Sequence, residues 1–142
     1  MKKYIFIFIF ISFFIGHLFG QSNSVSDLIV NRCISMLGRS VPNGFIRIDR
    51  TRYYNEEGFI LTVENGVVVS SGFQSNFNTF NEAHEFNGVL YNYFENSRNN
   101  WILFSSSSEG DIYSRNRVFA TIVRPSRRND GVIVNIILFD RY

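Results

Sequence analysis

The dipeptide Asn65-Gly66 restricts the fold of this chain more than any other local feature, because a run of strand-forming residues lies on each side of it. Asn and Gly tolerate the two positive φ angles of a type I′ turn, the commonest two-residue connection of a β-hairpin. Residues 59–64 and 67–73 are therefore predicted to be antiparallel strands with a fixed register. That register pairs Glu64 with Val67, Val63 with Val68 and Leu61 with Ser70.

Two amphipathic segments predict helices. The first covers residues 25–37, where apolar residues recur at helical spacing. A Ser-x-x-Asp start signal at 24–27 precedes it, and Gly38 follows as a residue typical of a helix end. The second helix opens on a Thr-x-x-Glu capping box at 79–82 and continues to about Ser97, with its apolar residues on less than half of its circumference.

The remaining sequence is predicted to be β-structure joined by short turns. Further strands are expected at 45–54, at 101–106 with a continuation at 111–113, at 117–124 and at 132–141, with a loop at 125–131. The last strand is apolar on both alternating faces, which favours a central position. The element order α-βββ-α-βββ predicts an α+β fold, in which an antiparallel sheet of about five to six strands carries both helices on one face.

The N-terminus has the pattern of an export signal. Lys2 and Lys3 precede an apolar run at 4–19 that is shorter than the roughly 20 residues a spanning helix needs. Small residues fit a cleavage site after Gly20 or after Ser22, and the sequence does not decide between them. A secreted or periplasmic location is predicted, with an uncleaved membrane anchor as the alternative.

Cleavage after Ser22 divides the chain into a signal peptide at 1–22 and a single small α+β domain at 23–142. Both lysines leave with the signal, so the domain carries 12 arginines against 12 acidic residues. This balance argues against a nucleic-acid partner, because binding to phosphates needs an excess of positive charge. Cys33 is the only cysteine, so no disulfide within the chain is expected and the fold must depend on its apolar core.

No motif for catalysis, a metal or a cofactor stands out, and none is predicted. His84 is the only histidine after the predicted signal, and its position on the second helix fits the rim of the core. A zinc site needs three or four ligands, which one Cys and one His do not supply. His84 with carboxylates and arginines nevertheless defines one alternative, a small secreted hydrolase or nuclease.

Two basic stretches are the candidate binding residues. Arg124, Arg127 and Arg128 fall within five residues of the predicted 125–131 loop and its border, and paired arginine hydrogen bonds can hold an anionic group there. Arg50 and Arg52 precede Tyr53 and Tyr54, a combination suited to stacking on a ligand. A solvated loop and a charged cover for a sheet edge are the respective alternatives.

By elimination, the sequence favours a non-enzymatic exported domain that binds another macromolecule. The expected partner is a protein or an anionic ligand at the cell envelope or outside the cell, with membrane contact only through an uncleaved signal. A structural or accessory domain of an envelope assembly is a further alternative. Convergence of His84, a carboxylate and two arginines in one cleft would favour the enzyme, whereas an exposed apolar surface would favour binding.

Overall fold

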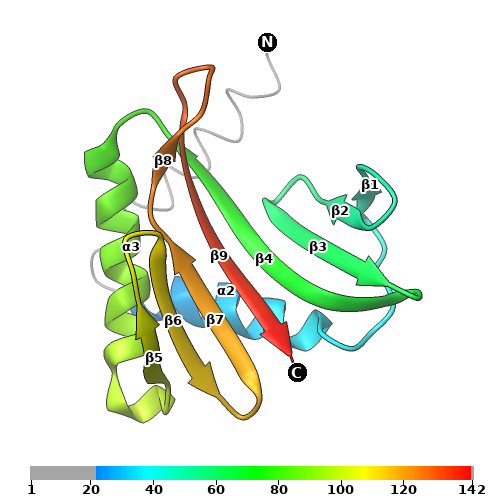
Figure 1. Cartoon of the computed structure of the whole chain (residues 1–142), viewed down its shortest axis with the longest axis horizontal. Helices are drawn as coiled ribbons and strands as arrows, with labels where there is room; N and C mark the ends of the chain where they lie inside the picture. Colours follow the sequence, from blue (N-terminus) through cyan, green and yellow to red (C-terminus); the bar gives the residue numbers. More distant parts are fainter. Residues whose placement is uncertain (1–21, 142) are drawn as a thin grey trace.

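A computed structural model describes residues 22–141 as two α-helices, a short 3₁₀-helix and an antiparallel sheet of nine strands (Figure 1). The predicted signal lies outside these residues, except for Ser22. The helices are α2 (Ser22–Met36), α3 (Phe80–Glu95) and η1 (Ser97–Asn99). The strands are β1 (Ile46–Arg47), β2 (Arg52–Tyr54), β3 (Phe59–Glu64), β4 (Val67–Phe77), β5 (Ile102–Ser106), β6 (Gly110–Arg115), β7 (Val118–Val123), β8 (Ser126–Arg127) and β9 (Ile133–Arg141).

The strand order across the sheet is β1-β2-β3-β4-β9-β7-β6-β5, and β8 pairs with the first part of β9. The C-terminal strand β9 lies between β4 and β7, as its apolar character predicts. The two outer strands are therefore β1 and β5, which Figure 1 shows on opposite sides of the molecule.

Both helices pack on one face of the sheet. Ser71 in β4 donates its hydroxyl to the carbonyl of Cys33 in α2 at 2.7 Å. Asn135, the cross-strand partner of Ser75, donates its side-chain amide to Asn87 in α3 at 2.6 Å. Ser71 and Ser75 are an even number of residues apart in one strand, so their side chains point to the same face.

The core on this face consists of cross-strand rows of buried side chains. One row crosses the sheet from β3 to β5, and its first five members are at most 4% exposed, whereas the last is 54% exposed. In order, the row consists of Leu61, Ser71, Phe139, Ala120, Tyr113 and Leu103. The core therefore ends before the β5 strand.

The α+β class, the antiparallel sheet and the two helices are confirmed, but the predicted strand count and order are wrong. The predicted strand at 45–54 is two strands, because the carboxylate of Asp49 accepts the backbone N–H groups of Thr51 and Arg52, both at 3.0 Å, and closes a turn. Part of the predicted 125–131 loop is β8, and 110–115 is a full strand. The order is α-ββββ-α-βββββ.

The hairpin at Asn65-Gly66 forms with φ values of 51° and 79°. Glu64 pairs with Val67 and Val63 with Val68, as predicted. The predicted pairing of Leu61 with Ser70 is wrong, because the register shifts between Thr62 and Val63 and places Leu61 opposite Ser71. A bulge adds one residue to a single strand of a pair, and the residue pattern beside the turn does not reveal it.

Both predicted helices form, and one predicted helix cap is wrong. Thr79 and Glu82 form the predicted capping box of α3, and Gly38 has the predicted positive φ, 77°. Helix α2 already begins at Ser22, so Ser24 lies within it and is not the cap.

Candidate functional site

The predicted Arg50, Arg52, Tyr53 and Tyr54 lie on the short β1–β2 hairpin at one side of the sheet. The Arg52 Nε lies 2.5 Å from the Asp49 carboxylate. Hydrogen bonds from the Thr51 amide and Arg52 lower the pKa of Asp49 to about 2. Tyr53 is partly buried against the core, and Tyr54 is 40% exposed.

The three other predicted arginines follow β7 but do not converge. The Arg124 guanidinium lies 3.7 Å from the Asp111 carboxylate, and that of Arg127 lies 5.5 Å from the ring centroid of Phe80. Arg128 pairs with Asp130 at 2.5 Å within the turn before β9. Each has a different partner, and three strands separate this region from the β1–β2 hairpin. The structure therefore does not bring the two predicted sets together.

His84 and Cys33 lie on different helices and in different environments. His84 is exposed on α3 and stacks on Phe80, with ring centroids 6.3 Å apart. Cys33 is fully buried, and burial raises the pKa of its thiol to about 12. Among residues 22–141, no group of three or more His, Cys, Asp or Glu side chains can hold a metal ion.

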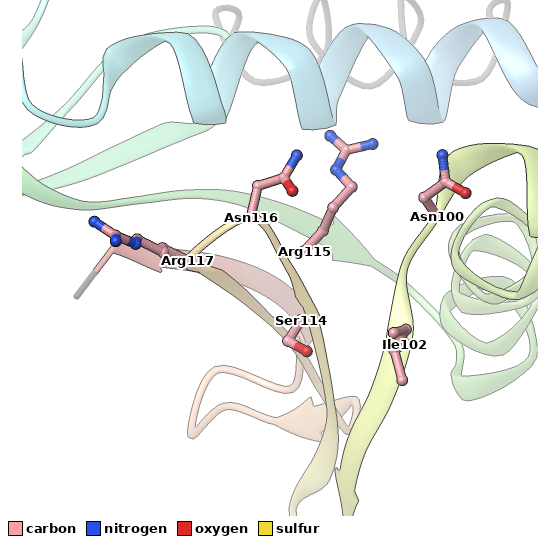
Figure 2. Close-up of a pocket in the computed structure, with 6 residues that line it drawn as sticks. All are labelled: Asn100, Ile102, Ser114, Arg115, Asn116 and Arg117. Atoms are coloured by element: carbon pink, nitrogen blue, oxygen red, sulfur yellow. The ribbon is translucent and has the colours of Figure 1, made fainter.

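A hollow of about 520 Å³ lies at the start of β5, beside the ends of β6 and β7. Figure 2 shows the side chains of this β5 hollow, with Asn100, Arg115 and Asn116 directed to the same side and Arg117 directed away from them. The β5 hollow is lined by Asn100, Ile102, Ser114, Arg115, Asn116 and Arg117. The sequence analysis singled out none of these residues as a site.

Three of the lining residues have left-handed backbone conformations. Their φ values are 57° for Asn100, 50° for Asn116 and 63° for Arg117. Asn116 and Arg117 form the two-residue turn between β6 and β7, in which Arg115 pairs with Val118. Asn100 ends η1 and donates its backbone N–H to the carbonyl of Ser97 at 3.3 Å. Asn often adopts this conformation in turns, whereas it is uncommon for a residue such as Arg117.

Strand β5 begins at this hollow and exposes apolar side chains on both faces of the sheet. Ile102, Leu103 and Phe104 are 70%, 54% and 65% exposed. Leu103 extends the helix-side core row, whereas Phe104 contacts Phe119 on the helix-free face, with ring centroids 5.0 Å apart. Among residues 22–141, only β6 pairs with β5, so within this part of the chain the other side of the strand presents unpaired backbone groups. We call residues 102–106 the β5 edge.

A buried carboxylate anchors the β5 edge at its far end. Asp111 accepts the hydroxyl of Tyr91 in α3 at 2.5 Å and that of Ser106 in β5. Burial opposes ionisation of Asp111, but these hydroxyl donors and Arg124 outweigh it and hold its pKa below the ordinary value. Burial and the Asp111 carboxylate raise the pKa of Tyr91. The exposed β5 edge is therefore firmly attached to the domain.

Comparisons with family models, curated protein sequences and solved structures found no match for the chain. Within residues 22–141, neither helix has the length and apolar character needed to cross a bilayer.

Sequence reasoning missed the β5 hollow because it began a strand at Arg117 and did not recognise Asn116-Arg117 as a turn. The available signal was Asn116 between two β-rich runs, since Asn is favoured at the first position of a type I′ turn. Three consecutive apolar residues at 102–104, followed by four serines, were the signal for the β5 edge. A half-buried strand normally alternates apolar and polar residues.

Proposed function

We propose that this chain is an exported, non-enzymatic domain that binds another protein by pairing an extended segment of that protein with the β5 edge. The observation that supports this proposal is the run of three apolar side chains at 102–104, each more than half exposed on an outer strand. An exposed edge with unpaired N–H and C=O groups is the surface used in recognition by strand addition, where the main chain provides affinity and side chains provide specificity.

The β5 edge also indicates the chemistry of its partner. No charged side chain occurs from Trp101 to Ser108, so a charged side chain placed opposite would lose hydration without gaining a counter-charge. The partner segment is therefore extended and uncharged along β5, with apolar side chains against Leu103 on one face and Phe104 on the other. The matching surface extends onto the helix-free face through Phe119.

Export is part of this proposal, and its support is the N-terminal sequence pattern. Cleavage after Gly20 would leave α2 complete, whereas cleavage after Ser22 would remove its first residue. Intact-mass measurement of the chain recovered from outside the cytoplasm of expressing cells is expected to give one of these two products. A mass that includes Met1 would contradict cleavage.

Peptide display tests the binding proposal. A library of random peptides is selected on the immobilised full chain, and enriched peptides are assayed against two single-lysine variants. Phe104→Lys introduces a charge on the β5 edge, and Ile46→Lys is the matched control on the opposite outer strand, where Ile46 is 49% exposed. We expect enriched peptides to contain an uncharged apolar segment. Their affinity is expected to fall roughly ten-fold in Phe104→Lys and to be unchanged in Ile46→Lys.

Two results would contradict the proposal. Enriched peptides that bind Phe104→Lys as tightly as the unmodified chain would exclude the β5 edge. Sedimentation that shows a dimer, converted to a monomer by Phe104→Lys, would mean that a second copy occupies the edge instead of another protein.

A further inference from the structure

The β5 hollow contains a positioned cation whose hydrogen-bonding capacity is mostly unused. The Arg115 Nη1 donates to the backbone carbonyl of Asn99 at 2.9 Å, and the guanidinium carbon lies 4.5 Å from the ring centroid of Trp101. An Arg side chain has five N–H donors. Among residues 22–141, no carboxylate lies within 4.0 Å of Arg115 or Arg117. The charge of Arg115 is thus held in place without an ionic partner from this part of the chain.

Two carboxamides accompany this cation. The side chains of Asn100 and Asn116 point to the same side as the Arg115 guanidinium, and both residues have left-handed backbone conformations (Figure 2). Each carboxamide can donate two hydrogen bonds. Arg117 extends away from them, so Arg115 is the cation of this group.

A second hollow contains a cation that already has an ionic partner. It lies along the outer face of α2, where Asp27, Leu28, Asn31, Arg32 and Ser35 line it. Its only cation, Arg32, forms an ion pair with Glu57 and lies 4.4 Å from the ring centroid of Phe59. A cation with this local partner has little capacity left for a ligand.

We infer that the β5 hollow is a carboxylate subsite in which Arg115 pairs with a carboxyl group of the segment bound along β5. This inference rests on the proposed function. A planar guanidinium matches a carboxylate, and two neutral amide donors complement it without a second cation. Ile102 lines the hollow and is the first residue of the β5 edge, so the hollow lies at the end of the strand toward which a paired segment would continue.

Three peptides of alternating Val and Thr, each blocked at its N-terminus, test the subsite on the full chain. The first ends in Glu with an amidated C-terminus, the second in Gln with an amidated C-terminus, and the third in Gln with a free C-terminal carboxylate. The first is expected to bind roughly ten-fold more tightly than the second, because a charge-assisted pair replaces a neutral contact. Tight binding of the third identifies a chain terminus as the carboxylate source, whereas weak binding identifies an acidic side chain.

Two arginine variants test whether the preference for a carboxylate depends on Arg115. Arg115→Gln is expected to lose the preference for carboxylate and to keep its affinity for the amidated Gln peptide, which also shows that it is folded. Arg50→Gln, on the β1–β2 hairpin at the other side of the sheet, is the matched control and is expected to retain the preference. Trp101 is the only tryptophan, so a carboxylate at Arg115 is expected to change the intrinsic fluorescence of the unmodified chain and not that of Arg115→Gln.

The outcomes separate the two proposals. Equal affinity for all three peptides, or a preference that persists in Arg115→Gln, would overturn the carboxylate subsite and leave strand addition in place. Failure of all three peptides to bind the unmodified chain, when peptides of this composition are also absent from the display selection, would overturn both.

Discussion

The two outer strands of the sheet differ in how their exposed groups are satisfied. At the β1–β2 edge, Arg47 donates to the carbonyls of Asp49 and Arg50 at 2.7 and 3.0 Å, and Arg52 pairs with the Asp49 carboxylate. The outermost strand there has two residues. At the β5 edge, five consecutive residues are exposed, and none is charged.

This difference shows where the fold prevents association and where it leaves association possible. Short, charged outer strands discourage pairing with other chains, whereas uncharged apolar ones favour it. Of the arginines that are most conspicuous in the sequence, Arg52, Arg124 and Arg128 pair with carboxylates and Arg127 lies over the ring of Phe80. The surface that we propose for a partner is the one where the sequence is apolar and exposed.

The largest expected effect comes from disrupting the start of β6 at Gly110, where β6 pairs with β7. A Cβ added at Gly110 would lie 2.3 Å from the backbone oxygen of Ile122, so Gly110→Ala must displace main-chain atoms. We expect a loss of about 3 kcal/mol in the free energy of unfolding, measured by urea denaturation. Gly88→Ala is the control, because nothing lies within 4 Å of its added Cβ, and it should stabilise α3 by about 0.5–1 kcal/mol. Equal changes in the free energy of unfolding for Gly110→Ala and Gly88→Ala would contradict the close approach of Gly110 to Ile122.

The next largest loss of stability is expected on removing the Asp111 carboxylate, which accepts a hydrogen bond from Ser106 in β5. Asp111→Asn is expected to cost about 2 kcal/mol at neutral pH, since two hydroxyl donors lose their charged acceptor. Because the folded-state pKa of Asp111 is lowered, its contribution is present above the unfolded pKa of about 3.9 and is lost as the pH falls through the folded value. The difference in urea midpoint between the unmodified chain and Asp111→Asn should therefore narrow below about pH 4. A difference in urea midpoint that stays constant across this pH range would contradict a stabilising role of the ionised Asp111 carboxylate.

The smallest effect concerns the turn at the β5 hollow. Arg117 has a φ of 63° at the position that Gly66 occupies in the β3–β4 turn, where φ is 79°. Arg117→Gly is expected to raise the free energy of unfolding by about 0.5–1 kcal/mol, because Gly adopts this conformation without a Cβ clash. Loss of stability in thermal and urea unfolding would show that the Arg117 side chain has a structural role.

Local signals in the sequence predicted much of the fold. The capping box at Thr79, the glycine stop at Gly38 and the turn at Asn65-Gly66 each depend on a few neighbouring residues, and each forms. Features that depend on tertiary pairing were not accessible in this way. The register shift near Val63 and the short strand β8 exist because of their partner strands, β4 and β9.

The candidate site was less predictable than the fold. Charge clusters in a sequence do not show which charges have local partners, as Arg52 and Arg128 do here. Exposure of Phe104 depends on the position of β5 in the strand order, and a run of apolar residues by itself predicts burial. Arg115 and Asn100 line the same hollow because β5, which follows Asn100, pairs with β6, which ends at Arg115.

Hydrogen exchange of the full chain, with and without a peptide enriched in the display selection, tests the central claim most directly. Backbone amides that become hydrogen-bonded to an added strand exchange more slowly. We predict slower exchange at residues 102–106 on peptide binding, with exchange at 46–54 and 124–131 unchanged. Slower exchange at 46–54 or 124–131, with none at 102–106, would contradict the claim that β5 is the binding edge.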